Sequence, residues 1–335
     1  MRIPTAALLL LAMNGYAAEW RDGDAAQWVA AQGGQSKQDG QGRVTAANLR
    51  ASWITDTDLA ALARMPLLST LDLSLTRVTD LGLERLKALE NVTDLNLYYA
   101  ELVTDAGLAH LRAWKKLKKL NVRGTKVNDS GLEHISHLTT VTSLDVGYGE
   151  VTNNGLDYLT SLTNLSELTI GGNKLTDAGM SFLKLMPQLT VLDLGGSQRT
   201  DSGLWSCTLT DRGLDHVLSV GNLQELGLWG TKITDIGVAK LTALKELRAL
   251  DLGRTQVTGK GLQNLAGLPK LERLQLWLAP RVTDEAVPAL IAISSLKEVD
   301  LTDTEVTADG IAKLRQERPN LKILWSAERG KLPSR

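Results

Sequence analysis

Cysteine, phenylalanine and an excess of charge of either sign are nearly absent from this chain. Its 335 residues include one cysteine, Cys207, so a disulfide within the chain is excluded. One phenylalanine and an aromatic content of 4% leave little material for a core of bulky rings. The formal net charge of -1 gives no electrostatic footprint for nucleic acid, which we do not expect as a partner. Cys207 is either a small, partly buried residue, which we favour, or a reactive thiol.

Signatures of catalysis and metal binding are also lacking. No nucleophile elbow, HExxH motif, EF-hand loop or glycine-rich phosphate loop stands in the sequence. His134 and His137 are three residues apart, but no third ligand accompanies them, so a solvated helix face is the better interpretation. Glycoside hydrolysis needs one carboxyl group in an apolar setting. The aspartates described below are expected to be solvated. We predict no enzyme, no cofactor and no metal.

What the chain does contain is a repeat. The leucine at position 71 returns at regular intervals, as Leu95, Leu120, Leu144, Leu168, Leu192, Leu226, Leu250, Leu274 and Val299, with Leu324 as a partial echo. Neighbouring copies lie 24 or 25 residues apart, except for one step of 34 residues between Leu192 and Leu226. A fixed period in this range predicts a solenoid that forms one domain, because each repeat contacts only its neighbours.

Each copy changes its hydrophobic period once. Leu71 and Leu73 alternate with polar residues, as in a short strand, whereas Leu83 and Leu86 have the three-residue spacing of one helix face. Between them, a Thr-Asp pair at 79–80 is typical of a helix N-cap. A glycine then recurs inside the first helical turn, where it costs up to about 1 kcal/mol relative to alanine. We therefore expect this glycine to permit close approach of neighbouring repeats.

These features resemble the leucine-rich-repeat superfamily, most closely the cysteine-containing subtype with its LxxLxLxxCxxITDxGLxxL pattern. Where that subtype often has cysteine, this chain has Thr76, Thr125, Thr231, Thr255 and Thr304, with Asn173 and Ser197 as variants. The resemblance covers roughly residues 47–326. It implies an α/β solenoid of about ten repeats, a horseshoe with a concave parallel β-sheet and convex helices. A family defined by a scaffold does not fix a function.

The segments outside the repeats suggest an exported protein with a capped solenoid. Residues 1–17 read as a signal peptide, with Arg2, a short apolar run and a cleavage site after Ala17, although an ordinary buried segment is the alternative. The mature chain would be secreted or periplasmic, without a membrane span. We expect residues 18–46 to cap the repeats, with a helix over 24–31 carrying Trp28 and a strand over 43–49. Residues 321–325 would form a last strand and 327–335 a disordered tail.

Two columns of strand residues face away from the leucine core. Neighbouring members of a column stack about 4.8 Å apart. The first column contains no Lys or Arg and runs Asp72, Asn96, Asn121, Asp145, Thr169, Asp193, Gly227, Asp251, Gln275, Asp300. The second runs Ser74, Tyr98, Arg123, Gly147, Gly171, Gly195, Trp229, Gly253, Trp277, Thr302. From Asp145 onward, the carboxylates of the first column fall on every second repeat, so the column is acidic.

Three consecutive glycines of the second column predict a bare floor with aromatic borders. Aromatic rings beside carboxylates on such a surface can hold a sugar chain or an extended peptide. The candidate ligand-binding residues are Tyr98, Tyr99, Asp145, Tyr148, Asp193, Trp205, Trp229, Asp251 and Trp277. The alternative is that these aromatics are scattered and the glycines only fit tight curvature. Two other tryptophans are assigned elsewhere: Trp114 to the core and Trp325 to the C-terminal end.

The 34-residue step contains an insertion at about 198–209, around Trp205. Its start, Thr200 to Leu204, looks like a helix start, and we expect the extra residues to form a loop beside the glycine floor. Long loops on rigid scaffolds commonly carry binding, although an insertion without function remains open. We predict an exported scaffold that binds a protein or peptide through its concave face. The alternatives are a glycan binder that uses Trp229, Trp277 and the Asp column, and a purely structural surface protein.

Overall fold

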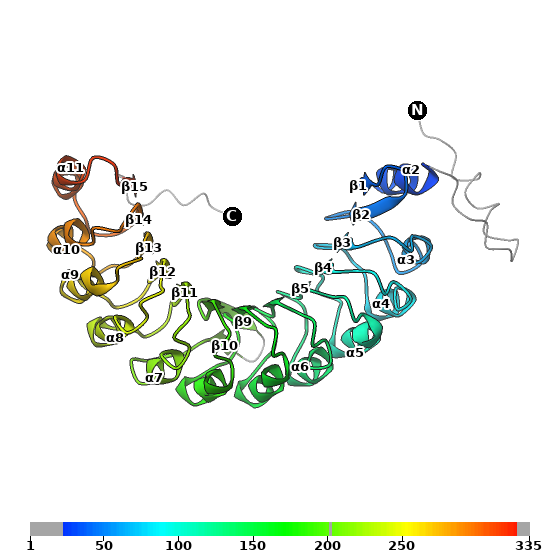
Figure 1. Cartoon of the computed structure of the whole chain (residues 1–335), viewed down its shortest axis with the longest axis horizontal. Helices are drawn as coiled ribbons and strands as arrows, with labels where there is room; N and C mark the ends of the chain where they lie inside the picture. The colour runs from blue at the N-terminus through cyan, green and yellow to red at the C-terminus, as the bar shows by residue number, and fades with distance from the viewer. Residues whose placement is uncertain (1–22, 201–202, 327–335) are drawn as a thin grey trace, which may run out of the picture.

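A computed structural model describes residues 23–200 and 203–326, which form one curved solenoid with the strands on the inner side and the helices on the outer side (Figure 1). The predicted signal peptide and C-terminal tail lie outside the described residues. The strands are β1 (Gln35–Gln38), β2 (Val44–Asn48), β3 (Thr70–Asp72), β4 (Asp94–Asn96), β5 (Lys119–Asn121), β6 (Ser143–Asp145), β7 (Glu167–Thr169), β8 (Val191–Asp193), β9 (Ser197–Thr200), β10 (Gly203–Ser206), β11 (Glu225–Gly227), β12 (Ala249–Asp251), β13 (Arg273–Gln275), β14 (Glu298–Asp300) and β15 (Lys322–Leu324).

Thirteen of these strands form a single sheet in chain order, which β9 and β10 do not enter. Only β1 and β2 are antiparallel, and every later neighbour in the sheet is parallel. The leucine columns are in register: Leu71 pairs with Leu95, and Leu192 pairs with Leu226 across the long step. Their side chains are buried between sheet and helices, where each contributes about 1.5–3 kcal/mol. The predicted leucine-rich-repeat horseshoe is confirmed.

The convex side carries one short helical segment or more per repeat. The helices are α2 (Asp24–Ala31), α3 (Leu59–Leu62), α4 (Asp80–Arg85), α5 (Asp105–Ala109), η1 (His110–Ala113), α6 (Asp129–Ile135), η2 (Asn153–Ser161), η3 (Asp177–Leu185), α7 (Leu214–Val217), α8 (Asp235–Leu241), α9 (Gly259–Leu262), η4 (Gln263–Gly267), η5 (Asp284–Ala286), α10 (Val287–Ala292) and α11 (Ala308–Glu317). Several are 3₁₀-helices, which the sequence pattern did not distinguish because leucines three residues apart suit either helix type.

Most of the Thr-Asp pairs cap a helix as predicted, although the Thr176 side chain makes no cap hydrogen bond, and the pairs also link neighbouring repeats. Thr79 Oγ1 accepts a hydrogen bond from the Leu81 amide at 3.2 Å. Asp80 then accepts two bonds from the next repeat, from the Thr104 amide at 2.8 Å and the Thr104 hydroxyl at 2.7 Å. The same two hydrogen bonds join six other pairs: Asp56 and Thr79, Asp129 and Thr152, Asp177 and Thr210, Asp211 and Thr234, Asp235 and Thr258, Asp284 and Thr307. We call this series the Asp-Thr ladder.

The recurring glycine lets each ladder aspartate approach the next helix. A Cβ atom on Gly107 would lie 2.5 Å from Asp80 Oδ1 and 2.9 Å from a methyl group of Leu83. Close approach of neighbouring repeats is therefore confirmed as the role of this glycine. At one junction both residues change together: Gly259 replaces the aspartate, and the buried Ala286 replaces the glycine.

Both ends of the leucine stack are closed. Helix α2 and strand β2 form where they were predicted, and Trp28 is buried against the first repeats. Strand β1 was not predicted, because its Gln-Ser-Lys-Gln sequence shows no apolar alternation. At the other end, Trp325 packs against the core as expected, and its indole N–H donates to the Val306 carbonyl at 3.1 Å. Arg318 donates to backbone carbonyls of the preceding repeat, including those of Ile293 and Leu296 at 2.8 Å each.

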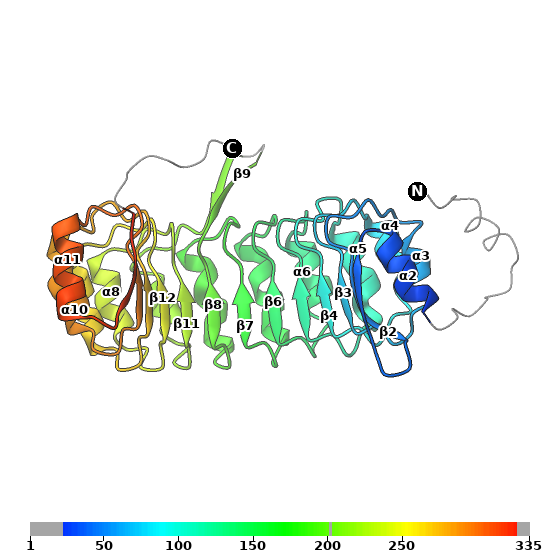
Figure 2. The same ribbon diagram turned by 90° about the horizontal axis from the view of Figure 1, so that it is seen from above.

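The insertion folds differently from the prediction. Strands β9 and β10 form an antiparallel hairpin that projects from one edge of the horseshoe, so neither a helix start at Thr200 nor an irregular loop is present (Figure 2). The ladder explains this, because Asp177 bonds Thr210 and so selects the later Thr-Asp pair as the helix cap. The repeat core has no position for Leu204, whose side chain is 65% exposed.

The concave face as candidate binding site

The first concave column has a structural role that sequence reasoning missed. The Asp or Asn side chain at this position accepts, through Oδ1, a hydrogen bond from the amide two residues ahead, where the strand ends. Asp193 bonds the Gly195 amide at 2.8 Å, and Asn96 bonds the Tyr98 amide at 3.0 Å. The same bond is made by Asp72, Asn121, Asp145, Asp251 and Asp300. The preference of Asp and Asn for such local bonds was the available signal.

Three members of this column are partly buried, whereas the sequence predicted solvated side chains. Burial raises the pKa of the Asp145 and Asp193 carboxyl groups above their usual range and raises the pKa of Asp251 to about 6. The Asp193 charge also raises the pKa of both other carboxyl groups, while an amide hydrogen bond opposes the shift at each site. Desolvation wins because the sheet is concave here and rings lie alongside, so the charged form of each carboxyl group is disfavoured.

The second carboxylate oxygen, Oδ2, has a partner in Asp145 and in Asp251, and the two partners differ. Asp145 Oδ2 lies 3.7 Å from the Arg123 guanidinium, and Asp251 Oδ2 accepts a long bond of 3.4 Å from the Trp277 indole N–H. Within the described ranges, no side chain donates a hydrogen bond to Asp193. A cation among the described residues therefore forms an ion pair with Asp145 but with neither Asp193 nor Asp251, while the charge of Arg123 also acts to lower the pKa of Asp193.

The glycine floor is not bare. A Cβ atom on Gly195 would overlap the Trp229 ring, and one on Gly253 would lie 2.5 Å from atoms of the Trp277 ring. Each tryptophan thus lies over the glycine of the preceding repeat. The two rings are neighbours, with centroids 5.4 Å apart and an interplanar angle of 49°. The glycines are needed for ring packing as well as for curvature.

A second aromatic group lies nearer the N-terminus. The Tyr98 and Tyr99 rings meet edge to face with centroids 4.7 Å apart. The Arg123 guanidinium lies 4.3 Å from the centroid of the Tyr148 ring, and the same guanidinium pairs with Asp145. Tyr99 and Tyr148 adopt left-handed backbone conformations, at φ 51° and 54°. Other repeats place glycine, leucine or arginine at the equivalent left-handed position, so this conformation belongs to the repeat and not to a special site.

A groove opens between the acidic column and Trp229, whose ring lies against that of Trp277. It has a volume of about 350 Å³ and is lined by strands β8, β11, β12 and β13. Gly227 forms its base, because a Cβ there would overlap the Asp193 carboxylate. Glu225 and Arg273, which also line it, pair with each other at 2.7 Å. We define the Asp-Trp groove by Asp193, Gly227, Trp229 and Asp251.

The hairpin stands beside the sheet and carries the ninth candidate residue. Gln198 fastens it to the rim by donating to the carbonyls of Gly149 at 2.7 Å and Gly172 at 3.0 Å. The Lys174 ammonium lies 5.7 Å from the centroid of the Trp205 ring. The structure therefore divides the nine predicted residues into the Tyr98, Tyr99, Asp145 and Tyr148 group, the Asp193, Trp229, Asp251 and Trp277 group, and Trp205 alone. Sequence reasoning did not identify Arg123, Glu225, Arg273 or Gln198, whose partners lie on other repeats.

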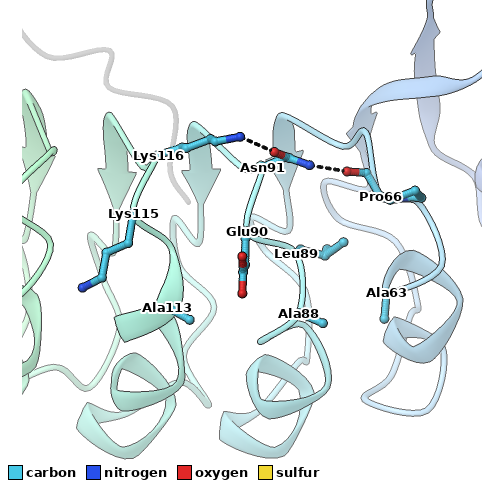
Figure 3. A pocket seen from close by; sticks show the side chains of 9 residues that line it. All are labelled: Ala63, Pro66, Ala88, Leu89, Glu90, Asn91, Ala113, Lys115 and Lys116. Carbon is cyan, nitrogen blue, oxygen red and sulfur yellow. Dashed lines mark hydrogen bonds between the residues drawn. The ribbon is translucent and has the colours of Figure 1, made fainter.

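A second hollow, of about 270 Å³, lies between successive repeats on the helical side (Figure 3). Two of its polar side chains link the repeats: Asn91 donates to the Pro66 carbonyl at 2.7 Å, and Lys116 donates to Asn91 at 2.6 Å. Asn164 and Asn222 make the same asparagine-to-carbonyl bond in other repeats. This hollow therefore belongs to the regular contact between neighbouring repeats.

Other predicted groups fall where they were expected. Trp114 is fully buried, and Cys207 is 2% exposed, with burial raising the pKa of its thiol to about 12. His134 is half-buried and His137 is exposed. Among residues 23–200 and 203–326, no three His, Cys, Asp or Glu side chains gather to hold a metal ion. The same residues contain no helix with the length and apolarity that crossing a membrane requires.

The fold and the repeat together define a class of protein. Two family models, both described as leucine rich repeat, match the sequence. One matches residues 221–276, and the other matches residues 64–87, 115–136, 137–159, 161–184 and 292–314. The chain belongs to the leucine-rich-repeat superfamily.

The chain is also similar to solved structures. The chain is similar to an internalin from Listeria monocytogenes, with a TM-score of 0.57 and 18% identity over 93% of this chain and 97% of the internalin. An internalin C2 from the same organism aligns with a TM-score of 0.44 and 24% identity, over 61% of this chain and 76% of that one. A leucine-rich-repeat protein from Leptospira interrogans aligns with a TM-score of 0.48 and 17% identity, over 79% of this chain and 74% of that one. No curated protein matches the sequence. At 18% identity, the first likeness indicates a shared fold alone.

Proposed function

We propose that this protein is an exported binding scaffold, not an enzyme, and that it takes a protein or peptide partner on its concave face. One observation carries the proposal: the Asp-Trp groove places a tryptophan pair beside two carboxyl groups that burial disfavours in their charged form. Ionisable groups with such perturbed pKa values concentrate at functional sites. The repeat itself requires neither tryptophan, because glycine, serine and threonine occupy the same column elsewhere.

A partner-capture experiment tests the proposal. The mature chain and its Trp229→Ala plus Trp277→Ala variant would each be used to capture proteins from the secreted fraction of the source cells. We expect the variant to lose the main partner, because central tryptophans commonly carry most of the energy of an interface. Tyr158→Ala is the matched control, since Tyr158 is a half-exposed aromatic residue on the convex helix η2. Identical partners for the wild type and the double variant would refute concave-face binding.

A glycan remains the second candidate, because tryptophan rings lie beside carboxylates in the groove. Chitin or peptidoglycan fragments would be titrated into the protein while tryptophan fluorescence is followed. A glycan that stacks on Trp229 or Trp277 would change the emission, and the double tryptophan variant would not respond. Unchanged emission at millimolar sugar would eliminate this candidate and leave the protein partner in place.

Export is proposed from the pattern of residues 1–17. Expression of the full chain in a bacterial host with a working secretion pathway should yield a mature protein that begins at Ala18. Intact-mass analysis of the extracellular or periplasmic fraction would show this directly. A chain that keeps Met1 and stays in the cytoplasmic fraction would contradict the proposal.

A further inference from the structure

We propose that the Asp-Trp groove is selective for cations, and that it receives the basic side chains of an extended peptide with Lys or Arg at every third residue. One basic side chain would pair with Asp193 and the next with Asp251. This inference rests on the proposed function, because it names the chemistry of the partner that the concave face would bind.

The charges that line the groove favour a basic occupant. Glu225 and Arg273 neutralise each other at 2.7 Å, which leaves Asp193 and Asp251 as the charges of the groove lining that have no ion-pair partner among the described residues. Neither Lys nor Arg occurs anywhere in their column. An extended surface that holds unpaired negative charge on a desolvated sheet is complementary to a positive partner.

The same face contains an internal template for this arrangement. At Asp145, the chain supplies its own cation: Arg123 pairs with the carboxylate and lies over the Tyr148 ring at 4.3 Å. The Asp-Trp groove repeats the combination of carboxylate and aromatic ring, with Asp251 beside Trp277 and Trp229, yet no Lys or Arg within the described residues pairs with it. A cation within about 6 Å of a tryptophan ring is attracted by the face of the ring. A basic side chain of the partner would therefore make at Asp251 the two contacts that Arg123 makes at Asp145.

The spacing of the carboxylates determines the register of the partner. Asp193 and Asp251 lie two strands apart in register, with Gly227 between them, which is about 9.6 Å at the usual strand separation. A polyproline II chain advances about 9.3 Å in three residues and presents every third side chain on the same side. Such a chain running across the strands would place successive basic residues on successive carboxylates. The same distance rules out one metal ion shared by both carboxylates, because cation–oxygen distances are about 2.0–2.6 Å.

A peptide series tests the inference on the mature protein. The first peptide carries lysine at every third position among prolines, the second has the same composition with its lysines consecutive, and in the third every lysine is acetylated. Calorimetry at pH 7.5 and low salt should show binding of the first peptide, weaker binding of the second and none of the third. Binding of the first peptide should also weaken as the pH falls from 7.5 to 5, because protonation of Asp251 removes a charge.

Two variants locate the site. Asp193→Asn plus Asp251→Asn removes both charges but keeps the local amide bond, since Asn96 and Asn121 make that bond in the same column. We expect this double variant to bind the first peptide with an affinity lower by at least about tenfold, which is the effect of losing charged hydrogen bonds. Asp72→Asn makes the same change on β3, away from the groove, and should leave affinity unchanged.

The outcomes separate this inference from the proposed function. Equal affinity for the spaced and consecutive lysine peptides would overturn the register, and full affinity in the double Asn variant would overturn the groove as the site. If no basic peptide binds but captured partners still depend on Trp229 and Trp277, cation selectivity is wrong while concave-face binding stands. A fluorescence response to glycans without any response to peptides would overturn both.

Discussion

Single carboxyl groups on the concave face work against the stability of the fold. Because burial raises the pKa of Asp251 to about 6, the folded protein holds this proton more tightly than the unfolded chain does. The contribution of Asp251 to stability is therefore greatest below the unfolded pKa near 4, falls as the pH rises towards 6, and is level above that value. The chain keeps charges here that cost it free energy of unfolding at neutral pH.

Replacing Asp193 by asparagine should consequently stabilise the protein. The substitution removes a desolvated charge, while the asparagine oxygen still accepts the Gly195 amide bond. We expect the free energy of unfolding at pH 7 to rise, since asparagine has no charged form for burial to disfavour. Denaturant melts at pH 7 and pH 3.5 would measure it, and the gain should vanish at the lower pH. A variant less stable than the wild type at pH 7 would contradict the desolvation argument.

Prediction from sequence was most successful for residues that the repeat dictates and least successful where partners come from another repeat. The leucine columns, the threonine caps and the close-approach glycines follow from local periodicity. The desolvation of Asp193 and the covering of Gly195 by Trp229 depend on which side chain leans across a neighbouring strand. The aligned repeat sequences give the order in which residues stack but not the direction in which an aromatic side chain such as Trp229 tilts.

At the scale of the element, each helix cap depends on the repeat before it. Thr200-Asp-Ser-Gly-Leu204 and Thr210-Asp-Arg-Gly-Leu214 are nearly the same motif, yet only the second leads into a helix, where Thr210 Oγ1 accepts from the Arg212 amide in the turn before α7. Asp177 can bond a single threonine, and the sheet register fixes which one lies in reach. The local sequence therefore predicts two helix starts, and the hydrogen bonds between Asp177 and Thr210 determine that the second one forms.

The exceptional junction at Gly259 leads to a prediction that runs against the repeat consensus. A Cβ atom on Gly259 would lie 2.6 Å from the Ala286 amide nitrogen, because the backbone of the next repeat has moved into the space of the missing carboxylate. Gly259→Asp restores the consensus residue but should lower the free energy of unfolding by about 1–3 kcal/mol through overpacking.

Thermal melts of Gly259→Asp would be compared with those of Gly221→Ala, where a new Cβ meets nothing within 4 Å. The control should change stability by no more than about 0.5 kcal/mol. A consensus variant as stable as the wild type would show that the junction relaxes freely.

At the scale of the whole molecule, stability is a chain of contacts between neighbours, so each end needs its own closure. Arg318 supplies one by donating to the final carbonyls of the preceding repeat, among them Ile293 and Leu296. Arg318→Ala would leave the Leu296 carbonyl without its donor, which costs about 1–3 kcal/mol, whereas the Ile293 carbonyl would keep the Leu296 amide at 3.1 Å.

The loss should be confined to one end of the solenoid. Hydrogen exchange should accelerate in α10 and α11 of Arg318→Ala and stay unchanged in α4 and α5, since each repeat contacts only its neighbours. Arg315→Ala, an exposed arginine on the same helix, provides the comparison. Uniform acceleration over all repeats would mean that the molecule unfolds as one cooperative unit.

The hairpin has a consequence for how this surface can vary. Strands β8 and β11 pair in the same register as every other neighbouring pair, as though the residues of β9 and β10 had never been inserted between them. The hairpin is therefore a side branch that carries none of the curvature of the arc (Figure 2). The length and sequence of the hairpin can therefore vary while the arc keeps its shape. This junction is a suitable position for inserting a new loop or a reporter group.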